Sequence, residues 1–552
     1  MNLLKILFEF IKISHYSQIF YSMTECISAN MHKNRRPISG FFSFLEKSLR
    51  RIFYPQNRGR FFYVNASKYG IMIQSVRRVY MRLKEFILGY PNGEHEAKLV
   101  ENFDTFFYDY DSNSERVLDE NRFLVLGRKG VGKTLLAEYV KKKASTQQDW
   151  LCDIVSYSTL GIHELLSKVD VPAKEYKALW LWIAYLEIIK LCAQNDDMDK
   201  ARRNDIAMFF VKTFSLDVFA DKNAGFLRAL ELIIREYKQR RIAKLNEYLK
   251  ALETIVIDAM KTAPTKYTLF IDNLDFHFIN SDAYTNTIKS LIRTIMGLNA
   301  TFNKKEVDCK ILILLRTDIF IMFNDANLQT MKRDYFLKID WGTQLQNDSP
   351  LIAMLAHRLR VSNPVLAHMD LGDIIRTLLP DPINNVHPVK FLLSRSFFRP
   401  RHLNAYLRFI RSKHLYAPYI NRYMLMSTEM DYAKHMMKEV RMEMEGHFEE
   451  SKIESAFSLL AQFAPLCEYS QNTFIFPEIE EFYHRIAFSI HHYDLKELLK
   501  ILFDFNVLNN VWYDKTLRKH LYSSRVKKNR ISQIDYDKRF QINPGIRRAL
   551  IY

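Results

Sequence analysis

Short apolar runs bounded by polar residues recur along the first two thirds of the chain. Three of them, residues 123–126, 267–271 and 309–315, have the length of strands that are buried on both faces of a sheet. Longer segments with the period of a helix separate these runs. Strands that alternate with helices predict an α/β fold, in which right-handed crossovers make the sheet parallel.

The segments between and after these runs predict many helices. The middle of one of them, residues 179–185, is apolar all round, which is typical of a helix packed inside the protein. Beyond residue 345 the strand signal fades and helical patterns continue alone. The predicted helices cover residues 136–147, 173–192, 201–260, 350–372, 400–414 and 425–465.

The pattern changes again near the C-terminus. Asp494 is placed to cap a helix over residues 495–505. Two segments of alternating polarity follow it, residues 519–526 and 531–542, and they predict a β-hairpin with Lys-Lys-Asn-Arg at its turn. A helix followed by a basic-tipped hairpin is typical of a winged helix.

Eight residues between the first predicted strand and the helix after it match the phosphate-loop pattern G-x-x-x-x-G-K-[ST]. Such a loop directs backbone N–H groups at an anion, and the helix dipole favours negative charge there. We expect the loop to bind the phosphates of ATP, with Lys133 at the β- and γ-phosphates and the Thr134 hydroxyl on Mg²⁺. The loop residues are Gly127, Arg128, Lys129, Gly130, Val131, Gly132, Lys133 and Thr134.

Two aspartates follow the second predicted strand. Asp272 at the strand end fits a Walker B acid, which holds Mg²⁺ opposite the Thr134 hydroxyl. Asp275 is a candidate to orient or deprotonate the attacking water, and its alternative role is an N-cap for the next helix. No glutamate directly follows Asp272, so we expect slow turnover.

Three arginines are further candidates for the nucleotide site. Arg316 ends the third predicted strand, where ligands bind in open α/β sheets. It either contacts the γ-phosphate or reports its loss, or it forms a structural ion pair with Asp318 or a neighbouring residue. Arg399 and Arg401 flank a proline at the start of a later helix, and either one reaching back to the nucleotide would couple the angle of a lid to the phosphate state.

The formal net charge of +18 is concentrated at the two ends of the chain. Residues 1–80 hold 13 Lys/Arg against 3 Asp/Glu, and residues 511–552 hold 11 against 3. The body between them is close to neutral. Basic ends on a neutral body indicate an anionic partner, most simply DNA or a partner bound to nucleic acid, and the alternative is a solvated basic surface.

Composition places the protein among helix-rich globular chains of a reducing compartment. Its 15 glycines and 15 prolines are few for 552 residues, and its five cysteines form no C-x-x-C pair. No run of about 18–20 apolar residues is present, and the N-terminus lacks a small-residue cleavage site. We therefore expect a cytoplasmic protein without a membrane span.

The motifs together resemble the STAND/AAA-like branch of P-loop ATPases, and in particular a poorly characterised bacterial P-loop ATPase family. The shared features are an acidic segment at residues 93–96, Arg-Lys-Gly inside the loop, Asp340-Trp341, and Phe-x-Arg-Pro-Arg at residues 397–401. We interpret Trp341 as a packing anchor. The resemblance covers about residues 85–545.

This resemblance implies an additional-strand catalytic sheet, a helical lid and a C-terminal winged helix. It also implies that the protein works in antiviral defence or in a prophage, or acts on DNA as an initiator-type ATPase. Asn273 and Phe276 depart from the glycine and acid that are common after the first Walker B aspartate, and this departure affects hydrolysis more than binding.

We divide the chain into four expected parts and assign it one expected function. The parts are a basic extension (1–80), a P-loop NTPase domain (81–345), a helical lid (346–440) and a basic winged-helix-like domain (441–552). The extension is either a basic arm or sequence upstream of a start near Met72 or Met81. The expected function is a slow ATP-driven switch that acts on or near DNA. The alternative is a nucleotide-stabilised scaffold that recruits an effector protein, and a homo-oligomer is a further expected assembly.

Overall fold

The computed structural model divides the chain into two compact units, residues 1–80 and 81–552. In the first unit, β1 (Arg60–Ser67) pairs antiparallel with β2 (Gly70–Arg77), and the rest of the expected basic extension lies outside the described residues. The structure describes residues 60–67, 70–77, 82–119, 121–157, 176–220, 224–239, 241–262, 264–275, 278–323, 325–330, 332–343, 345, 348–380, 382–383, 386–470, 473–486, 493–516, 519–523, 526–527, 530–531 and 533–551.

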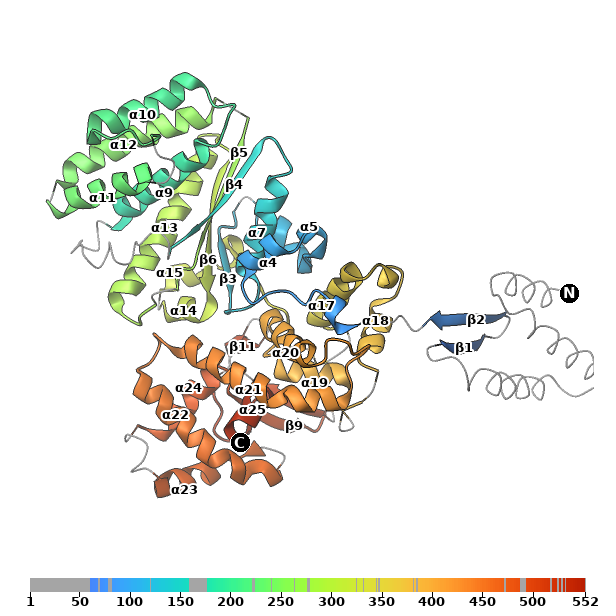
Figure 1. Cartoon of the computed structure of the whole chain (residues 1–552). Helices are drawn as coiled ribbons and strands as arrows, with labels where there is room; N and C mark the ends of the chain where they lie inside the picture. The colour runs from blue at the N-terminus through green and yellow to red at the C-terminus, as the bar shows by residue number, and fades with distance from the viewer. Residues whose placement is uncertain are drawn as a thin grey trace, which may run out of the picture. The chain divides into compact units, whose positions relative to one another are not determined.

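The second unit is built on a five-stranded parallel sheet, so this part of the chain is an α/β protein as predicted (Figure 1). The order of the strands across the sheet is β4-β5-β6-β3-β7, and every neighbouring pair is parallel. The strands are β3 (Leu124–Gly127), β4 (Trp150–Ser156), β5 (Lys266–Asp272), β6 (Cys309–Arg316) and β7 (Phe336–Lys338).

Three of these strands confirm the sequence prediction, and two were not predicted. β3, β5 and β6 are nearly continuous runs of buried residues, which is why their hydropathy is easily read. β4 and β7 form the two edges of the sheet. Most residues of β4 are only half-buried, and β7 is three residues long, so neither produces an apolar run of strand length.

Helices cover both faces of the sheet (Figure 1). One face packs against α9 and α13, and the other packs against α7, on whose outer side the short helices that precede β3 lie. These helices are α4 (Gly93–Leu99), α5 (Phe103–Phe106), α6 (Asn113–Arg116), α7 (Lys133–Ala144), α9 (Tyr176–Cys192) and α13 (Asp282–Lys304).

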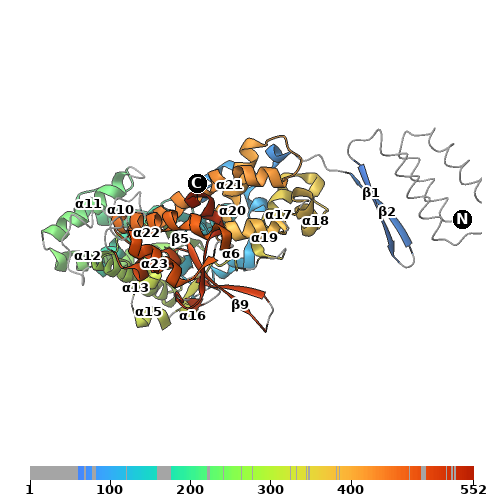
Figure 2. The same cartoon turned by 90° about the horizontal axis from the view of Figure 1, so that it is seen from below.

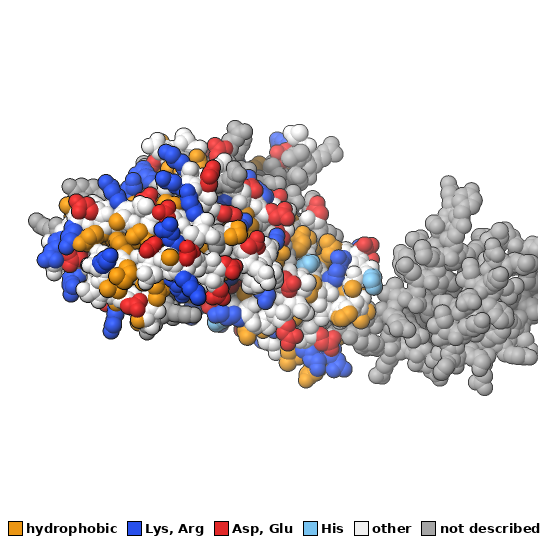
Figure 3. Space-filling model, turned by 90° about the horizontal axis from the view of Figure 1, so that it is seen from above, with side chains coloured by type: hydrophobic (Ala, Val, Ile, Leu, Met, Phe, Trp, Pro, Cys, Tyr) orange, Lys and Arg blue, Asp and Glu red, His pale blue; other side chains and the backbone are white. Residues whose placement is uncertain are grey.

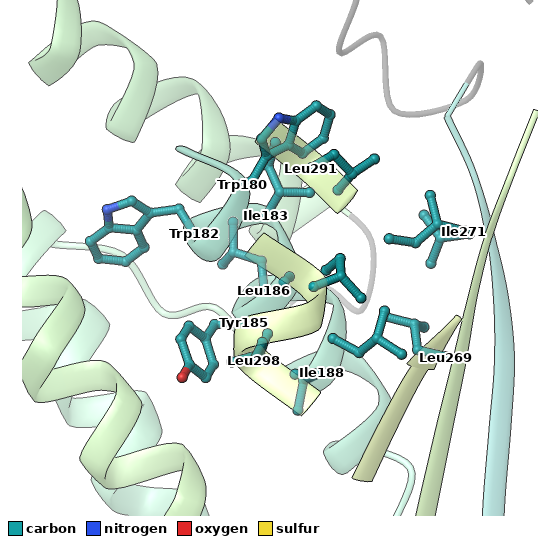
Figure 4. Close-up of a cluster of buried hydrophobic side chains, with 14 of the residues drawn as sticks. Trp180, Trp182, Ile183, Tyr185, Leu186, Ile188, Leu269, Ile271, Leu291 and Leu298 are labelled. Atoms are coloured by element: carbon teal, nitrogen blue, oxygen red, sulfur yellow. The ribbon is translucent and has the colours of Figure 1, made fainter. Parts of the chain in front are cut away.

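The main hydrophobic core lies between α9, α13 and the sheet. Trp182, Tyr185 and Ile188 of α9 are buried completely, and Figure 4 shows this helix beside Leu291 and Leu298 of α13 and facing Leu269 of β5. The prediction of an internal helix is therefore confirmed. The core extends into a helical insertion between β4 and β5, made of α10 (Lys200–Phe214), α11 (Ala224–Lys238) and α12 (Ile242–Met260).

A helical segment follows the sheet. The predicted helix over residues 350–372 ends at Ser362, because Asn363-Pro364 cannot continue it. Short helices also lie between β6 and β7. The helices of these two segments are α14 (Thr317–Met322), α15 (Ala326–Thr330), α16 (Lys332–Tyr335), α17 (Pro350–Ser362), α18 (Leu371–Leu378), α19 (Pro388–Arg395), α20 (Pro400–Lys413) and α21 (Arg422–Met444).

The predicted helix over residues 425–465 is two helices separated by a turn at Gly446. This glycine has φ +80°, and a Cβ atom there would lie 2.1 Å from the carbonyl oxygen of Phe278. Only glycine allows this backbone conformation and this close approach. α21 therefore runs across residue 440, the expected boundary between the lid and the C-terminal domain. α22 (Glu450–Phe463) starts after the turn.

The C-terminal region combines helices with a small antiparallel sheet. The strand order is β10-β9-β13-β8, and a separate pair, β11 with β12, lies between β10 and β13 in the sequence. The elements are β8 (Thr473–Phe474), α23 (Phe476–Ile486), α24 (Leu495–Asp504), β9 (Leu508–Asp514), β10 (Lys519–Ser523), β11 (Val526–Lys527), β12 (Arg530–Ile531), β13 (Arg539–Ile542) and α25 (Pro544–Ile551).

The predicted helix after Asp494 is confirmed, because the Asp494 side chain accepts a hydrogen bond from the Glu497 backbone N–H at 3.0 Å. The predicted hairpin is correct only at its tip, where β11 pairs with β12. Farther from the tip, β10 and β13 both pair with β9 instead of with each other. The sequence reading missed β9, whose polar residues interrupt its apolar ones. Among the described residues, no helix combines the length and apolar character that a membrane crossing requires.

Candidate nucleotide site

The loop between β3 and α7 is held in a tight curve by its glycines. Gly130 and Gly132 have φ values of +83° and +103°, which side chains with a Cβ rarely adopt. At Gly127 a Cβ atom would lie 2.5 Å from the Val131 Cγ2 atom. The curve places Lys133 at the first position of α7, so the loop residues stand at a helix N-terminus.

Lys133 folds back over the loop. Its Nζ atom donates to the carbonyl oxygens of Gly127 at 2.9 Å and Arg128 at 3.3 Å. Burial lowers the pKa of the Lys133 ammonium, and the Asp275 and Asp272 carboxylates oppose that shift only in part. An anion bound at the loop would therefore stabilise the charged form of this lysine.

Thr134 and Asp272 meet at the carboxyl end of the sheet. The Thr134 hydroxyl donates to the Asp272 Oδ2 atom at 2.6 Å, and Asp272 is 4% exposed. Burial raises the pKa of the Asp272 carboxyl, although the bonds from Thr134 and from the Asn273 N–H act in the opposite direction. The two residues are 138 positions apart in the sequence, and the structure brings them into direct contact.

The pair fits Mg²⁺ as the cation of a bound nucleotide. A hydroxyl and a carboxylate are hard oxygen ligands, and Mg²⁺ commonly takes one or two protein ligands and completes its shell with phosphates and water. Among the described residues, no group of three or more His, Cys, Asp or Glu side chains is placed to hold a metal ion without such help. The residues therefore suit a metal that arrives with phosphates.

Arg316 lies in a cluster of acids at the end of β6. Its guanidinium pairs with Asp318 at 2.5 Å and with Asp275 at 3.3 Å, and it donates to the backbone oxygen of Glu443 at 3.0 Å. The ion pair with Asp318, one of the two alternatives for Arg316, is present. A contact of Arg316 with the γ-phosphate stays a prediction.

Asp275 does not cap the described helix that follows it. Among the described helices, the next one is α13, and Ser281 caps it by accepting a hydrogen bond from the Tyr284 N–H at 3.2 Å. The cap interpretation of Asp275 is therefore wrong. Its side chain is instead 29% exposed and pairs with Arg316 through one carboxylate oxygen, Oδ2.

His447 completes the acid cluster from the turn after α21. Its Nε2 atom lies 2.9 Å from the Asp318 Oδ2 atom. Burial acts to raise the pKa of Asp318, but Arg316 and His447 together outweigh it and hold that pKa well below the usual range. The turn at Gly446 thus ties the C-terminal region to the strand end that carries Arg316.

Arg399 and Arg401 both reach the phosphate loop from the start of α20. The Arg399 Nη1 atom donates to the Glu443 carboxylate at 2.6 Å and to the Lys129 carbonyl at 3.2 Å. The backbone N–H of Arg401 donates to the Gly130 carbonyl at 3.3 Å, and a Cβ atom on Gly130 would lie 2.9 Å from the Arg401 Cβ atom. The structure therefore brings both predicted arginines into contact with the backbone of the loop.

Arg128 connects the loop to the C-terminal region. Its Nη2 atom donates to the carbonyl oxygen of Asp504, the last residue of α24, at 2.8 Å. Burial, followed by the nearby Arg399, lowers the pKa of the Arg128 guanidinium to about 10. Among the described residues, two nitrogens of Arg128 and two of Arg399 have no hydrogen-bond partner. Buried cations with free donors beside a glycine loop favour an anion there.

A pocket lined by aromatic rings opens next to the loop. Trp341 is 8% exposed and donates its indole N–H to the Val131 carbonyl at 2.9 Å, which confirms its interpretation as a packing anchor. Tyr110 stacks on it with ring centres 5.3 Å apart. The pocket is lined by Phe107, Tyr108, Asp109, Tyr110, Asn113, Val131, Gly132, Leu135, Leu136, Ile339, Trp341, Met354, Arg358 and Pro400.

Sequence reasoning missed this pocket because its walls come from five separate segments of the chain. The available signal was the aromatic run at residues 106–110, which precedes the loop by less than 20 positions. A comparison of the chain with protein-family models and with curated proteins finds no match. The functional assignment therefore depends on the geometry of the site.

Proposed function

We propose that the protein binds ATP·Mg²⁺ and acts as a slow, nucleotide-controlled switch of the P-loop class. The contact between Thr134 and Asp272 is the observation that carries this proposal, because it joins the loop helix to a strand-end acid at hydrogen-bond distance. The strand order adds support, since β6 lies between β3 and β5, as in additional-strand P-loop sheets.

In this proposal each part of the site has one task. The loop N–H groups and Lys133 hold the phosphates, while Thr134 and Asp272 hold Mg²⁺, which neutralises phosphate charge. The pocket beside Gly132 is proposed to take the base, because it adjoins the loop and its lining is mostly apolar.

The switch is proposed to work through contacts between the loop and later parts of the chain. Arg399 and Arg401 begin α20, and Arg128 holds the end of α24, so a rearranged loop would change contacts with both. Hydrolysis is expected to be slow, because Asp275 is paired with Arg316. That pairing also favours the alternative, a nucleotide-stabilised scaffold without turnover that recruits an effector protein.

We further propose that residues 450–551 form a winged-helix domain that contacts DNA. The order α22, β8, α23, α24, β9 supports this assignment, as does the placing of β13, which follows β10, β11 and β12, between β8 and β9 in the sheet. The basic charge of residues 511–552 supports an anionic partner.

The binding proposal is tested by titrating a fluorescent ATP analogue in the presence of Mg²⁺. Lys133→Ala removes the ammonium from the loop, and we expect affinity to fall by about 10- to 150-fold, the equivalent of a hydrogen bond to a charged group. Lys142→Ala is the matched control, because Lys142 is exposed on the same helix. Equal affinities of the two variants would reject the proposed site.

The hydrolysis proposal is tested by phosphate release with and without DNA. We expect slow turnover by the wild type and a loss of turnover in Asp275→Ala, with ATP affinity retained. Absence of turnover in every condition, with binding intact, would leave the scaffold alternative.

A further inference from the structure

Contacts at the phosphate loop do not distinguish one nucleoside triphosphate from another, because all of them carry the same phosphates. Surface charge adds no such distinction on the face drawn in Figure 3, where acidic and basic side chains are intermixed. A preference for one base therefore has to arise where a base would bind. In the proposed function that place is the pocket beside Gly132.

Most of the pocket lining is apolar or already hydrogen-bonded. The Asp109 carboxylate accepts from the Ser114 backbone N–H at 3.1 Å and from its hydroxyl at 2.5 Å. Within the described lining, the buried side-chain atoms without a hydrogen-bond partner belong to two residues, Asn113 and Arg358. They are the Asn113 Oδ1 atom and the Arg358 Nε and Nη1 atoms.

The guanidinium of Arg358 is committed to residues outside the lining. Its Nη2 atom donates to the Glu96 Oε1 atom at 2.6 Å, and a Cβ atom on Gly89 would lie 2.3 Å from its Nη1 atom. The guanidinium also lies over the Phe106 ring, 4.6 Å from the ring centre. Arg358 is therefore the buried counter-charge of Glu96, and Asn113 is left as the candidate to contact a base.

Asn113 is held with its amide in one orientation. Its Nδ2 atom donates to the Tyr110 backbone oxygen at 2.5 Å, which identifies the nitrogen and leaves Oδ1 as the atom without a partner. The turn before it contains Asp111 and Ser112 with φ values of 59° and 49°, which side chains with a Cβ rarely adopt. Figure 2 shows α6, α17 and α20, which all supply lining residues, grouped together. The pocket wall thus contains one fixed hydrogen-bond acceptor.

We infer that Asn113 is the residue that selects the base, because its Oδ1 atom accepts a hydrogen bond from the 6-amino group of adenine. This inference rests on the proposed nucleotide site. A buried acceptor without a donor is unfavourable, so a ligand that supplies an N–H there gains affinity. Guanine and hypoxanthine carry a carbonyl oxygen at C6, which would face Oδ1 as a second acceptor. The amino group and the sugar are attached to different rings of the purine, so the amino group can meet the wall while the phosphates stay at the loop.

The test compares ATP with purine riboside 5′-triphosphate, which carries hydrogen in place of the 6-amino group. Both compete against a ribose-labelled fluorescent ATP analogue for the full-length chain in the presence of Mg²⁺. We expect the wild type to bind ATP about 2- to 13-fold more tightly, the range for one neutral hydrogen bond. In Asn113→Ala the two affinities should be equal. Each ratio is measured on one protein sample, so it does not depend on the fraction of that sample that is folded.

Asn404→Ala is the matched control. Asn404 is 4% exposed and its Oδ1 atom also has no partner among the described residues, but it does not line the pocket. We expect this variant to keep the wild-type ratio. A second measurement needs no variant: inosine triphosphate, with its carbonyl at C6, should bind the wild type no more tightly than purine riboside 5′-triphosphate does.

Four results would each overturn the inference and leave the nucleotide proposal standing. They are equal wild-type affinities for ATP and purine riboside 5′-triphosphate, an unchanged ratio in Asn113→Ala, a lost ratio in Asn404→Ala, and inosine triphosphate bound as tightly as ATP. If Asn113→Ala does not fold, the two wild-type comparisons still decide. A wild type that binds none of these triphosphates would reject the nucleotide proposal, and this inference with it.

Discussion

Glu443 is the buried acid that balances the arginines behind the phosphate loop, and its removal offers a direct test of how the loop is held. Its side chain is 2% exposed and pairs with Arg399 at 2.6 Å. Arg128 also lies near enough to lower the pKa of Glu443, and with Arg399 it outweighs the effect of burial, which acts in the opposite direction. Glu443→Ala would leave two buried guanidinium groups without their counter-charge.

The expected cost follows from that burial. Removing one partner of a buried ion pair costs about 3–5 kcal/mol, because the remaining charge stays desolvated. Glu439→Ala is the control from the preceding turn of α21. Glu439 faces Arg401 at 3.8 Å, and both side chains are partly exposed, so its loss should cost about 1 kcal/mol at most.

Native-state hydrogen exchange measures this difference locally, which suits a chain with several domains. We expect amides of α21 and of the Gly127–Thr134 loop to lose protection by between about a hundredfold and a few thousandfold in Glu443→Ala. In Glu439→Ala the loss should be about fivefold at most. Equal protection in the two variants would refute the reasoning, since it would mean that the arginines find other compensation.

Two further predictions concern the loop anchor and the acid cluster. Trp341→Phe keeps an aromatic side chain but replaces the indole by a smaller ring without the donor to the Val131 carbonyl, so ATP-analogue affinity should fall by about 2- to 13-fold. Trp182→Phe makes the same change at a buried indole whose nitrogen has no partner among the described residues, and it should leave that affinity unchanged. Asp318 has a lowered pKa in the folded state, so its stabilising contribution is complete above its unfolded pKa of about 3.9 and is lost as pH falls below that value. Intrinsic fluorescence followed from neutral pH to about pH 2 should therefore show an acid transition that is less steep in Asp318→Asn, because the loss occurs between the unfolded pKa and the lower folded pKa; an unchanged transition would contradict the assignment.

Local patterns in the sequence were sufficient to predict the central strands and the glycine loop between β3 and α7. β3, β5 and β6 are buried on both faces, and such strands appear in the sequence as continuous apolar runs. The loop is equally local, because its glycines, lysine and threonine occupy eight consecutive positions. Asp272 could also be chosen as a candidate metal ligand, because it directly follows one of the buried apolar runs.

The edge strands and the C-terminal pairing could not be predicted in the same way. β4 and β7 have only one neighbour each in the sheet, so burial does not require a long apolar run from them. β9 takes both β10 and β13 as partners, and this choice depends on residues about 30 positions away. Local alternation cannot distinguish such a pairing from a simple hairpin.

The sequence by itself determined the α/β class, the loop and the residue types that suit phosphate and Mg²⁺. Only the tertiary structure decided that Arg316 is engaged by Asp318 and Asp275, that Arg128 reaches the end of α24, and that aromatic residues from distant segments form one pocket. The reason is physical. Strand burial and loop curvature depend on neighbouring residues, whereas the partner of a buried charge is set by whichever segment packs against it.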